Sequence, residues 1–325
     1  VSGSGMQLFL QPAVGLTELS GEEHFVAVWS RETNGTADTD VFSRLFTSGG
    51  DAVGSGDTQL NSTASAVAPH IASNGDGRSV ELWTSSPSSA ARYRVLEPGA
   101  LPTAGLDETI PSSDVATGVP TIGAAPSGEF CMLWQQDDAT ADYQAAYCLG
   151  ADGSNTTSVL QSFGPSVSPV PVVTAMHGMN SITPIQDGFV VGWFVGSPAV
   201  YTGRRASVAG LPLGQPFPLA GIDGMVHAVN GLGEPQSAAF LAGFVADGLF
   251  GQSAAQRRPL IRPFASPATP SEDGSLASED HVLQYGLRLV GAPRDVFVAI
   301  WVEEDGTTNS CGIRARKFDA GLVPD

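Results

Sequence analysis

The sequence predicts an all-β fold, a six-bladed β-propeller of four-stranded antiparallel blades. Three observations predict it. An apolar run that ends in an aromatic residue recurs six times, turn residues and short strand-like segments surround each copy, and glycine (39 residues) and proline (23 residues) are frequent along the whole chain. The 325 residues are therefore expected to form a single propeller domain, 1–325, built from six repeats.

The apolar run is the most regular feature of the chain. Its six copies end at Trp29, Trp83, Trp134, Trp193, Phe244 and Trp301. Successive copies are spaced by 54, 51, 59, 51 and 57 residues, so the repeat is about 54 residues long. Six units of this length account for the whole chain. Regularly spaced tryptophans at strand ends predict packing against the next blade, and stacking platforms for sugars are the alternative.

Each apolar run is the expected second strand of a blade. It is apolar without alternation because neighbouring blades cover both of its faces. A polar loop and a third strand follow, as in DVFSRLF (40–46), and a weaker fourth strand comes after, as in QPFPLAG (215–221). The expected innermost strands precede the runs and include APHIAS (68–73), PTIGAA (120–125), VVTAM (172–176) and MVHAVN (225–230).

The sixth copy stops at FDAGLVPD, directly after its third strand. Its blade would then lack a fourth strand and leave an exposed edge, which invites aggregation. The apolar segment Met6–Leu10 (MQLFL) precedes the first copy. We expect this segment to pair with the strand Gly312–Phe318 and to close the ring by joining the N- and C-terminal strands.

The repeat unit resembles bacterial secreted β-propeller repeats of the form DGxFVVxW, acidic loop, I-x-A-R-x-F-D-A-x-G. The last copy, VFVAIWVEEDGTTNSCGIRARKFDAGLVPD (296–325), matches this pattern over its length, and the second, fourth and fifth copies match loosely. That family contains adhesins and enzymes. The resemblance therefore implies the architecture and an extracellular or cell-surface location, and leaves the ligand open.

The charge of the chain limits its partners. The formal net charge is −18, and Lys317 is the only lysine. Nucleic acid and anionic membranes are unfavourable partners because their binding depends on clustered basic residues. No apolar run approaches the roughly 18 to 20 residues of a membrane-spanning helix. The partner expected is a glycan or a protein at the cell surface, and self-association stays open.

Acidic residues gather after the tryptophan in three copies. They are Glu32, Asp38 and Asp40; Asp137, Asp138 and Asp142; and Glu303, Glu304 and Asp305. Hard oxygen ligands closely spaced in loops suit Ca²⁺. None of the three segments follows the D-x-[DN]-x-[DN]-G pattern, so solvated turns are the alternative. No cofactor is required otherwise.

Two cysteines fall in the same predicted hairpin. If the chain turns near Ala139 and Thr140, then Cys131 and Cys148 lie opposite one another and a cross-strand disulfide fits the geometry. Two buried free thiols are the alternative. Cys311 is left over, because three cysteines do not make a disulfide scaffold.

The sequence contains no motif of an established enzyme class. It has no G-x-S-x-G elbow, no phosphate loop, no dinucleotide fingerprint and no Asp box with sialidase spacing. The expected innermost strands lack the carboxylates that glycoside hydrolysis requires. The favoured function is a non-catalytic extracellular binding or assembly module that presents loops to a glycan or a protein. The alternatives are a propeller glycoside hydrolase and a structural subunit of a surface appendage.

Overall fold

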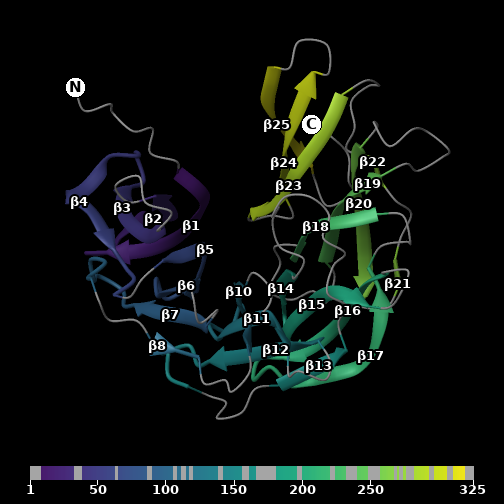
Figure 1. Cartoon of the computed structure of the whole chain (residues 1–325), viewed down its shortest axis with the longest axis horizontal. Coiled ribbons are helices and arrows are strands. Elements are labelled where there is room, and N and C mark those ends of the chain that lie inside the picture. Colours follow the sequence, from purple (N-terminus) through teal and green to yellow (C-terminus); the bar gives the residue numbers. More distant parts are fainter. Residues whose placement is uncertain are drawn as a thin grey trace. The chain divides into compact units, whose positions relative to one another are not determined.

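Figure 1 shows the computed structural model of the chain, in which every described element is a β-strand. It describes residues 9–32, 39–62, 65–85, 90–104, 108–110, 115–116, 120–137, 142–155, 161–165, 181–195, 200–219, 224–231, 240–247, 257–266, 269–270, 274–275, 282–292, 296–305 and 310–318. Over these ranges no helix has the length and apolarity needed to cross a membrane. The all-β prediction is confirmed.

Within these ranges, consecutive strands form six antiparallel sheets, which are numbered in chain order. The first sheet has the order β1-β2-β3-β4, with β1 Phe9–Leu19, β2 Glu22–Glu32, β3 Thr39–Thr47 and β4 Ala52–Gln59. The second has the order β5-β6-β7-β8, with β5 Ala66–Ser73, β6 Ser79–Ser85, β7 Ala90–Leu96 and β8 Glu108–Thr109. The third has the order β10-β11-β12-β13, with β10 Thr121–Ala124, β11 Phe130–Asp137, β12 Asp142–Leu149 and β13 Gln161–Pro165; β9 Val115–Ala116 pairs with β11.

The last three sheets repeat this order. The fourth is β14-β15-β16-β17, with β14 Ser181–Ile185, β15 Gly188–Val195, β16 Val200–Ser207 and β17 Pro212–Pro218. The fifth is β18-β19-β20-β21, with β18 Gly224–Gly231, β19 Phe240–Asp247, β20 Arg257–Ser266 and β21 Thr269–Pro270; β22 Gly274–Ser275 pairs with β20. The sixth is β23-β24-β25, with β23 Val282–Ala292, β24 Val296–Asp305 and β25 Ser310–Phe318.

Every apolar run identified in the sequence is the second strand of one of these sheets. The predicted third strand 40–46 corresponds to β3, the predicted strand Gly312–Phe318 to β25, and the predicted fourth strand 215–221 overlaps β17. One innermost strand was assigned wrongly: the first strand of the fourth sheet is β14, and residues 172–176 lie outside the described residues. The apolar SITPI segment of β14 pairs with β15 directly across a two-residue turn, which costs little loop entropy.

The chain divides into two compact units, and the boundary falls within β13. The first unit contains residues 1–162 and 208–210, and the second contains residues 163–207 and 211–325. Within the first unit the first strands β1, β5 and β10 are successive neighbours, and within the second unit β14, β18 and β23 are. In each unit, therefore, the first strands of successive sheets lie side by side.

Apolar second strands fill the space between sheets. Trp83 of β6 is fully buried in one core cluster with Val26 and Val28 of β2. Trp134 of β11 is buried in another with Val80 and Leu82 of β6. Each tryptophan thus packs against the sheet that precedes it in the chain. Burying an aromatic side chain of this size stabilises the fold by about 2–3 kcal/mol.

A disulfide joins Cys131 of β11 to Cys148 of β12. The two residues are direct cross-strand partners, with a Cα–Cα distance of 4.1 Å, as the predicted hairpin register requires. Both are buried. The turn after β16 covers the disulfide, because a Cβ added at Gly210 would lie 2.5 Å from Cys148 Sγ.

Among the described residues, the predicted pairing of the N-terminal segment with the C-terminal strand is not found. Phe9 and Leu10 pair with Arg31 and Ser30 of β2, so they extend β1 instead of joining β25. Residues 6–8 lie outside the described residues, and the described part of the sixth sheet ends at β25. A hairpin between neighbouring strands closes a much shorter loop than pairing across the whole chain, and this difference favours β2 as the partner.

We expect Gly210→Ala to destabilise the protein more than Gly214→Ala. Both glycines have positive φ, 76° and 63°, where an alanine costs about 1–2 kcal/mol. Only at Gly210 does the new methyl group also collide with Cys148, whereas nothing lies within 4 Å at Gly214. Urea unfolding of the two variants measures the difference, and equal losses of stability would show that the turn does not press on the disulfide.

Candidate functional site

Most of the acidic residues expected in loops lie on strand ends instead. Glu32 belongs to β2, Asp137 to β11, and Glu303–Asp305 to β24, while Asp40 and Asp142 begin the third strands. Asp38 and Asp138 lie outside the described residues. The correction follows from the backbone ladder, which continues three or four residues beyond Trp29, Trp134 and Trp301 because the backbone amides there still find ladder partners.

Asp40 has a structural partner. Asn61 Nδ2 donates a 2.8 Å hydrogen bond to Asp40 Oδ1, and Asn61 Oδ1 accepts one of 2.9 Å from the amide of Val41. Asn61 is buried. Asp40 therefore helps to hold the start of β3 against the end of the first sheet, a structural role that neither the Ca²⁺ prediction nor the solvated-turn alternative included.

Asp137 and Asp142 are direct cross-strand partners in the third sheet. Like charges placed directly opposite one another destabilise a ladder, so this hairpin end is a place where a cation or proton would be favourable. Within the ranges that the structure describes, no three His, Cys, Asp or Glu side chains are placed to hold a metal ion. Calcium binding, and the sharing of one face by the three acidic segments, stay predictions.

Four of the five tryptophans are core residues. Trp83, Trp134, Trp193 and Trp301 are at most 4% exposed, which leaves no face for a sugar. Trp29 is partly exposed and stacks on Phe42, with ring centroids 6.3 Å apart. Phe244 lies on β19, and its side chain is outside the described residues.

The sequence did not reveal a buried acid between the first and second sheets. Glu81 of β6 is 1% exposed, and Ser43 Oγ of β3 donates a 2.7 Å hydrogen bond to its Oε1. Arg94 is its cross-strand partner. Desolvation by burial raises the pKa of Glu81 to about 7, against the opposing effects of Ser43 and Arg94. Glu81 contacts the neighbouring sheet and is shielded from solvent, so its role is structural. In the sequence, its only sign is one acidic residue within the apolar run SVELW.

Tyr93 and Tyr147 form a second buried polar contact, between the second and third sheets. Their rings lie 6.1 Å apart, and Tyr93 donates a 2.7 Å hydrogen bond to Glu108 Oε2. Burial is the main cause that raises the pKa of both phenols. Both side chains belong to the core cluster of these two sheets, so they support packing.

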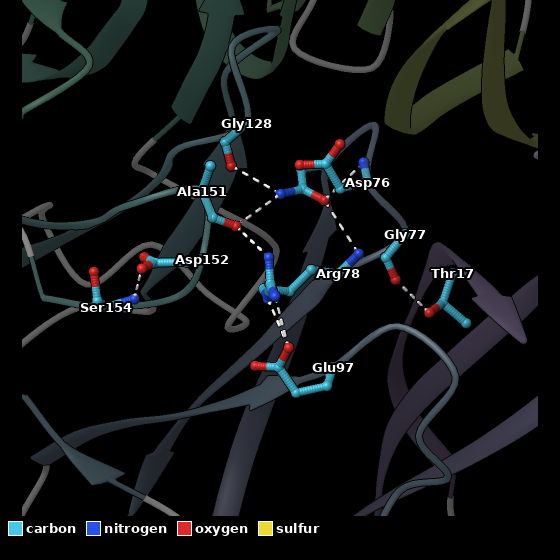
Figure 2. A network of polar contacts seen from close by, with 10 residues as sticks. Thr17, Asp76, Gly77, Arg78, Glu97, Gly128, Ala151, Asp152 and Ser154 are labelled. Carbon is cyan, nitrogen blue, oxygen red and sulfur yellow. Dashed lines mark hydrogen bonds and ion pairs between the residues drawn. The ribbon is translucent and has the colours of Figure 1, made fainter.

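Figure 2 shows polar contacts at the turns between first and second strands and between third and fourth strands. Asn74 Nδ2 donates to the carbonyl oxygens of Gly128 (3.0 Å) and Ala151 (3.2 Å) in the third sheet. Arg78 Nη1 donates to Ala151 O at 2.5 Å, and its Nε and Nη2 both donate to Glu97 Oε2. These contacts join the second sheet to the third. The sequence signalled only the turn, SNGDG, and not its partners.

The opposite end of each sheet carries the loops between second and third strands. These loops, including 33–38, 138–141 and 306–309, lie outside the described residues. The acidic strand ends therefore mark the edge of the candidate site. The first strands add no carboxylate to this candidate site. No acidic residue lies in β5, β10, β14, β18 or β23, and Glu18 of β1 lies at the turn end of its sheet.

The chain matches no family model and no curated protein. Solved structures resemble it in fold. The Hadza microbial sialidase Hz136 matches with a TM-score of 0.51 and 11% identity, over 94% of this chain and 65% of that one. A subtype N10 neuraminidase-like protein of A/little yellow-shouldered bat/Guatemala matches with a TM-score of 0.51 and 9% identity, over 95% and 93%.

Prolyl oligopeptidase B from Galerina marginata is also similar in fold, with a TM-score of 0.53 and 11% identity. The match covers 100% of this chain and 42% of the oligopeptidase, so this chain spans less than two thirds of the length of both that protein and the sialidase. At these identities the likeness shows a propeller-like fold. It does not choose a chemistry, because a sialidase and a peptidase share it.

We expect Asp142→Asn to raise the stability of the protein in the absence of divalent cations. The substitution removes a like-charge pair with Asp137, worth about 0.2–1 kcal/mol. Thermal unfolding in EDTA measures the gain. Millimolar Ca²⁺ should raise the melting temperature of the original protein only if the hairpin binds it, since a ligand of the native state stabilises by mass action. A lower melting temperature for Asp142→Asn in EDTA would show that the two carboxylates do not repel.

We expect stability to fall as the pH rises from about 4.5 to about 7, and Glu81→Gln to remove that dependence. In the unfolded chain a glutamate ionises near 4.5, whereas folded Glu81 keeps its proton up to about 7. The folded state binds more protons in this window, so raising the pH costs it roughly 3 kcal/mol. Urea unfolding across this range measures the difference between the two proteins. If the free energies of unfolding of the two proteins change with pH in parallel, Glu81 is ionised in its buried site over this range.

Proposed function

We propose that this chain is a single six-bladed propeller that works at the cell surface or outside the cell and hydrolyses a glycan. The observation that carries the proposal is the likeness to a sialidase and a neuraminidase-like protein over nearly the whole chain. The six consecutive antiparallel sheets, in each of which the first three strands follow one another in chain order, support the six-bladed ring. The step from fold to substrate is an analogy, and it needs a test on the residues.

Glycoside hydrolysis requires two carboxyl groups on either side of the bond that breaks. The described first strands supply none near the loop end of the sheets, as noted above. The acids would therefore come from the hairpins between second and third strands. Asp137, Asp138 and Asp142 form one set and Glu303–Asp305 another, whereas Asp40 is held by Asn61.

A non-catalytic module that binds a glycan or a protein is the second candidate. The absence of carboxylates from β5, β10, β14, β18 and β23 favours it, because a binding site needs no acid pair. Loops presented from a rigid scaffold are a common way to bind a partner. In this case the acidic hairpins would contact the partner or a bridging Ca²⁺. As a subunit of a surface appendage, the chain would bind copies of itself.

We expect the protein to release sugar from at least one member of a glycan panel, and neutralising one acidic hairpin to abolish turnover. The two test variants replace Asp137, Asp138 and Asp142 by Asn, or Glu303, Glu304 and Asp305 by Gln and Asn. Loss of a general acid or base lowers the rate by about 10²–10⁴-fold. Asp76→Asn is the control, because this exposed acid lies in a turn at the opposite end of its sheet.

Glycan binding without sugar release, with Ca²⁺ or in EDTA, would favour the binding module. Stable self-association by native mass spectrometry, with no glycan bound, would favour the structural subunit. Hydrolysis that both hairpin variants retain in full would contradict the assignment of the acids to these hairpins.

A further inference from the structure

Asn74 is the first residue of the turn between β5 and β6, and Gly75 follows it. Asparagine is chemically labile before glycine, because glycine has no side chain to hinder its own backbone nitrogen, which attacks the asparagine amide. The chain contains three such dipeptides, Asn34–Gly35, Asn74–Gly75 and Asn230–Gly231. The side chain of Asn74 belongs to the described residues, whereas those of Asn34 and Asn230 lie outside them. The surroundings of Asn74 decide whether its dipeptide reacts in the folded protein.

The oxygen and the nitrogen of the Asn74 side-chain amide both have hydrogen-bond partners. Nδ2 donates to the carbonyl oxygens of Gly128 and Ala151, two residues labelled in Figure 2, at 3.0 and 3.2 Å. Oδ1 accepts from the backbone amides of Asp76 and Arg78, each at 3.1 Å. Asn74 is only 9% exposed. The amide group is therefore fixed at both ends: its oxygen binds the turn of the second sheet, and its nitrogen binds the third sheet.

Close packing also holds this amide in place. A Cβ added at Gly128 would lie 2.8 Å from Ala151 Cβ and 3.5 Å from Asn74 Nδ2, so little free space surrounds the amide. Gly128 is itself held in its turn by a 2.9 Å hydrogen bond from its backbone amide to Ala125 O. Rotation of the Asn74 side chain therefore requires the second and third sheets to separate at this end.

Deamidation of Asn74 requires its amide nitrogen to leave. The backbone nitrogen of Gly75 gives up its proton to water and attacks Asn74 Cγ, so that a new C–N bond closes a cyclic imide. The Cγ–Nδ2 bond breaks as Nδ2 takes a proton from water and departs as ammonia. A water molecule then opens the imide at either of its carbonyl carbons and leaves aspartate or isoaspartate. Ammonia cannot depart without breaking both hydrogen bonds from Nδ2 to the third sheet.

We propose that Asn74 is a site of spontaneous deamidation that the docking of the third sheet on the second suppresses, and that its conversion to aspartate or isoaspartate prevents the two sheets from docking again at this end. Water is the co-reactant. Protection and loss of the contact have the same origin, because the donor atom that joins the two sheets is the leaving group of the reaction. The modification therefore makes an opening of this contact irreversible.

Neither product replaces the amide. An aspartate carboxylate only accepts hydrogen bonds, so it would face the carbonyl oxygens of Gly128 and Ala151 with no proton to share. Leaving such buried acceptors unpaired is costly. Arg78 does not offset the new charge freely, because its guanidinium is already paired with Glu97 at 2.6 Å. Isoaspartate also adds a methylene group to the main chain, which disrupts the 2.9 Å turn hydrogen bond from Asn74 N to Arg78 O.

Ageing of the full chain at physiological pH, followed by peptide mapping with mass spectrometry, measures the reaction at each dipeptide separately. In urea, where the chain is unfolded, we expect Asn34, Asn74 and Asn230 to react at similar rates, since the local sequence alone then sets the rate. In the folded protein Asn74 should react about 10²–10³-fold more slowly than in urea, because several hydrogen bonds must open together. Equal rates at Asn74 in the folded and the unfolded chain would overturn the proposal.

Two variants separate the chemistry from the packing. Gly75→Ala hinders the attacking nitrogen and should slow the reaction without loss of stability, since an added Cβ there meets no atom within 4 Å. Arg78→Ala removes a hydrogen bond to Ala151 and should speed the deamidation of Asn74 in the folded protein about tenfold. Where Arg78→Ala does not fold, urea below the unfolding midpoint opens the same contact in the original protein. A rate at Asn74 that neither change raises would contradict protection by this contact.

Asn74→Asp reproduces one product of the reaction. We expect it to melt several degrees below Asn155→Asp, which adds the same charge at an exposed position after the turn of the third sheet. The original protein should lose stability as it ages, whereas aged Gly75→Ala should not. Equal melting temperatures for Asn74→Asp and Asn155→Asp would show that the modification does not prevent docking. These readouts are independent of glycan hydrolysis, so they do not depend on the proposed activity.

Discussion

Packing of one sheet on the next through the second strands is the interaction on which the rest of the structure depends. A single twisted sheet of four short strands buries too little apolar surface to be stable alone. Trp83 and Trp134 solve this by inserting into the sheet before them, where each is almost completely excluded from water. Stability therefore accumulates sheet by sheet, as in repeat proteins.

This packing separates the two ends of each sheet. At the turn end, Asn74 and Arg78 bond to backbone carbonyls of the third sheet and hold neighbouring sheets in register. At the other end the hairpins carry acids such as Asp137 and Asp142, whose charges oppose close packing. The described polar contacts between sheets thus gather at the turn end.

Buried polar groups between the sheets add specificity to the apolar packing. Glu81 reaches Ser43 of the first sheet and lies across from Arg94 of its own sheet, so the two sheets fit in one relative position. Tyr93 and Tyr147 act in the same way between the second and third sheets. Such groups cost desolvation energy and contribute mainly by excluding other arrangements.

The sequence by itself determined the features that depend on short-range pairing. The apolar runs mark the second strands because strand pairing is local, and counting residues around one turn places Cys131 opposite Cys148. The sequence did not reveal the contacts between sheets. The partners of Glu81 and Asn74, the structural role of Asp40, and the pairing of Phe9 with Arg31 depend on how sheets stack and on which of two competing edges a strand joins. These contacts join residues about 20 to 300 positions apart in the sequence. Which of them form depends on the relative free energies of alternative arrangements of the sheets, and only the tertiary structure decided this.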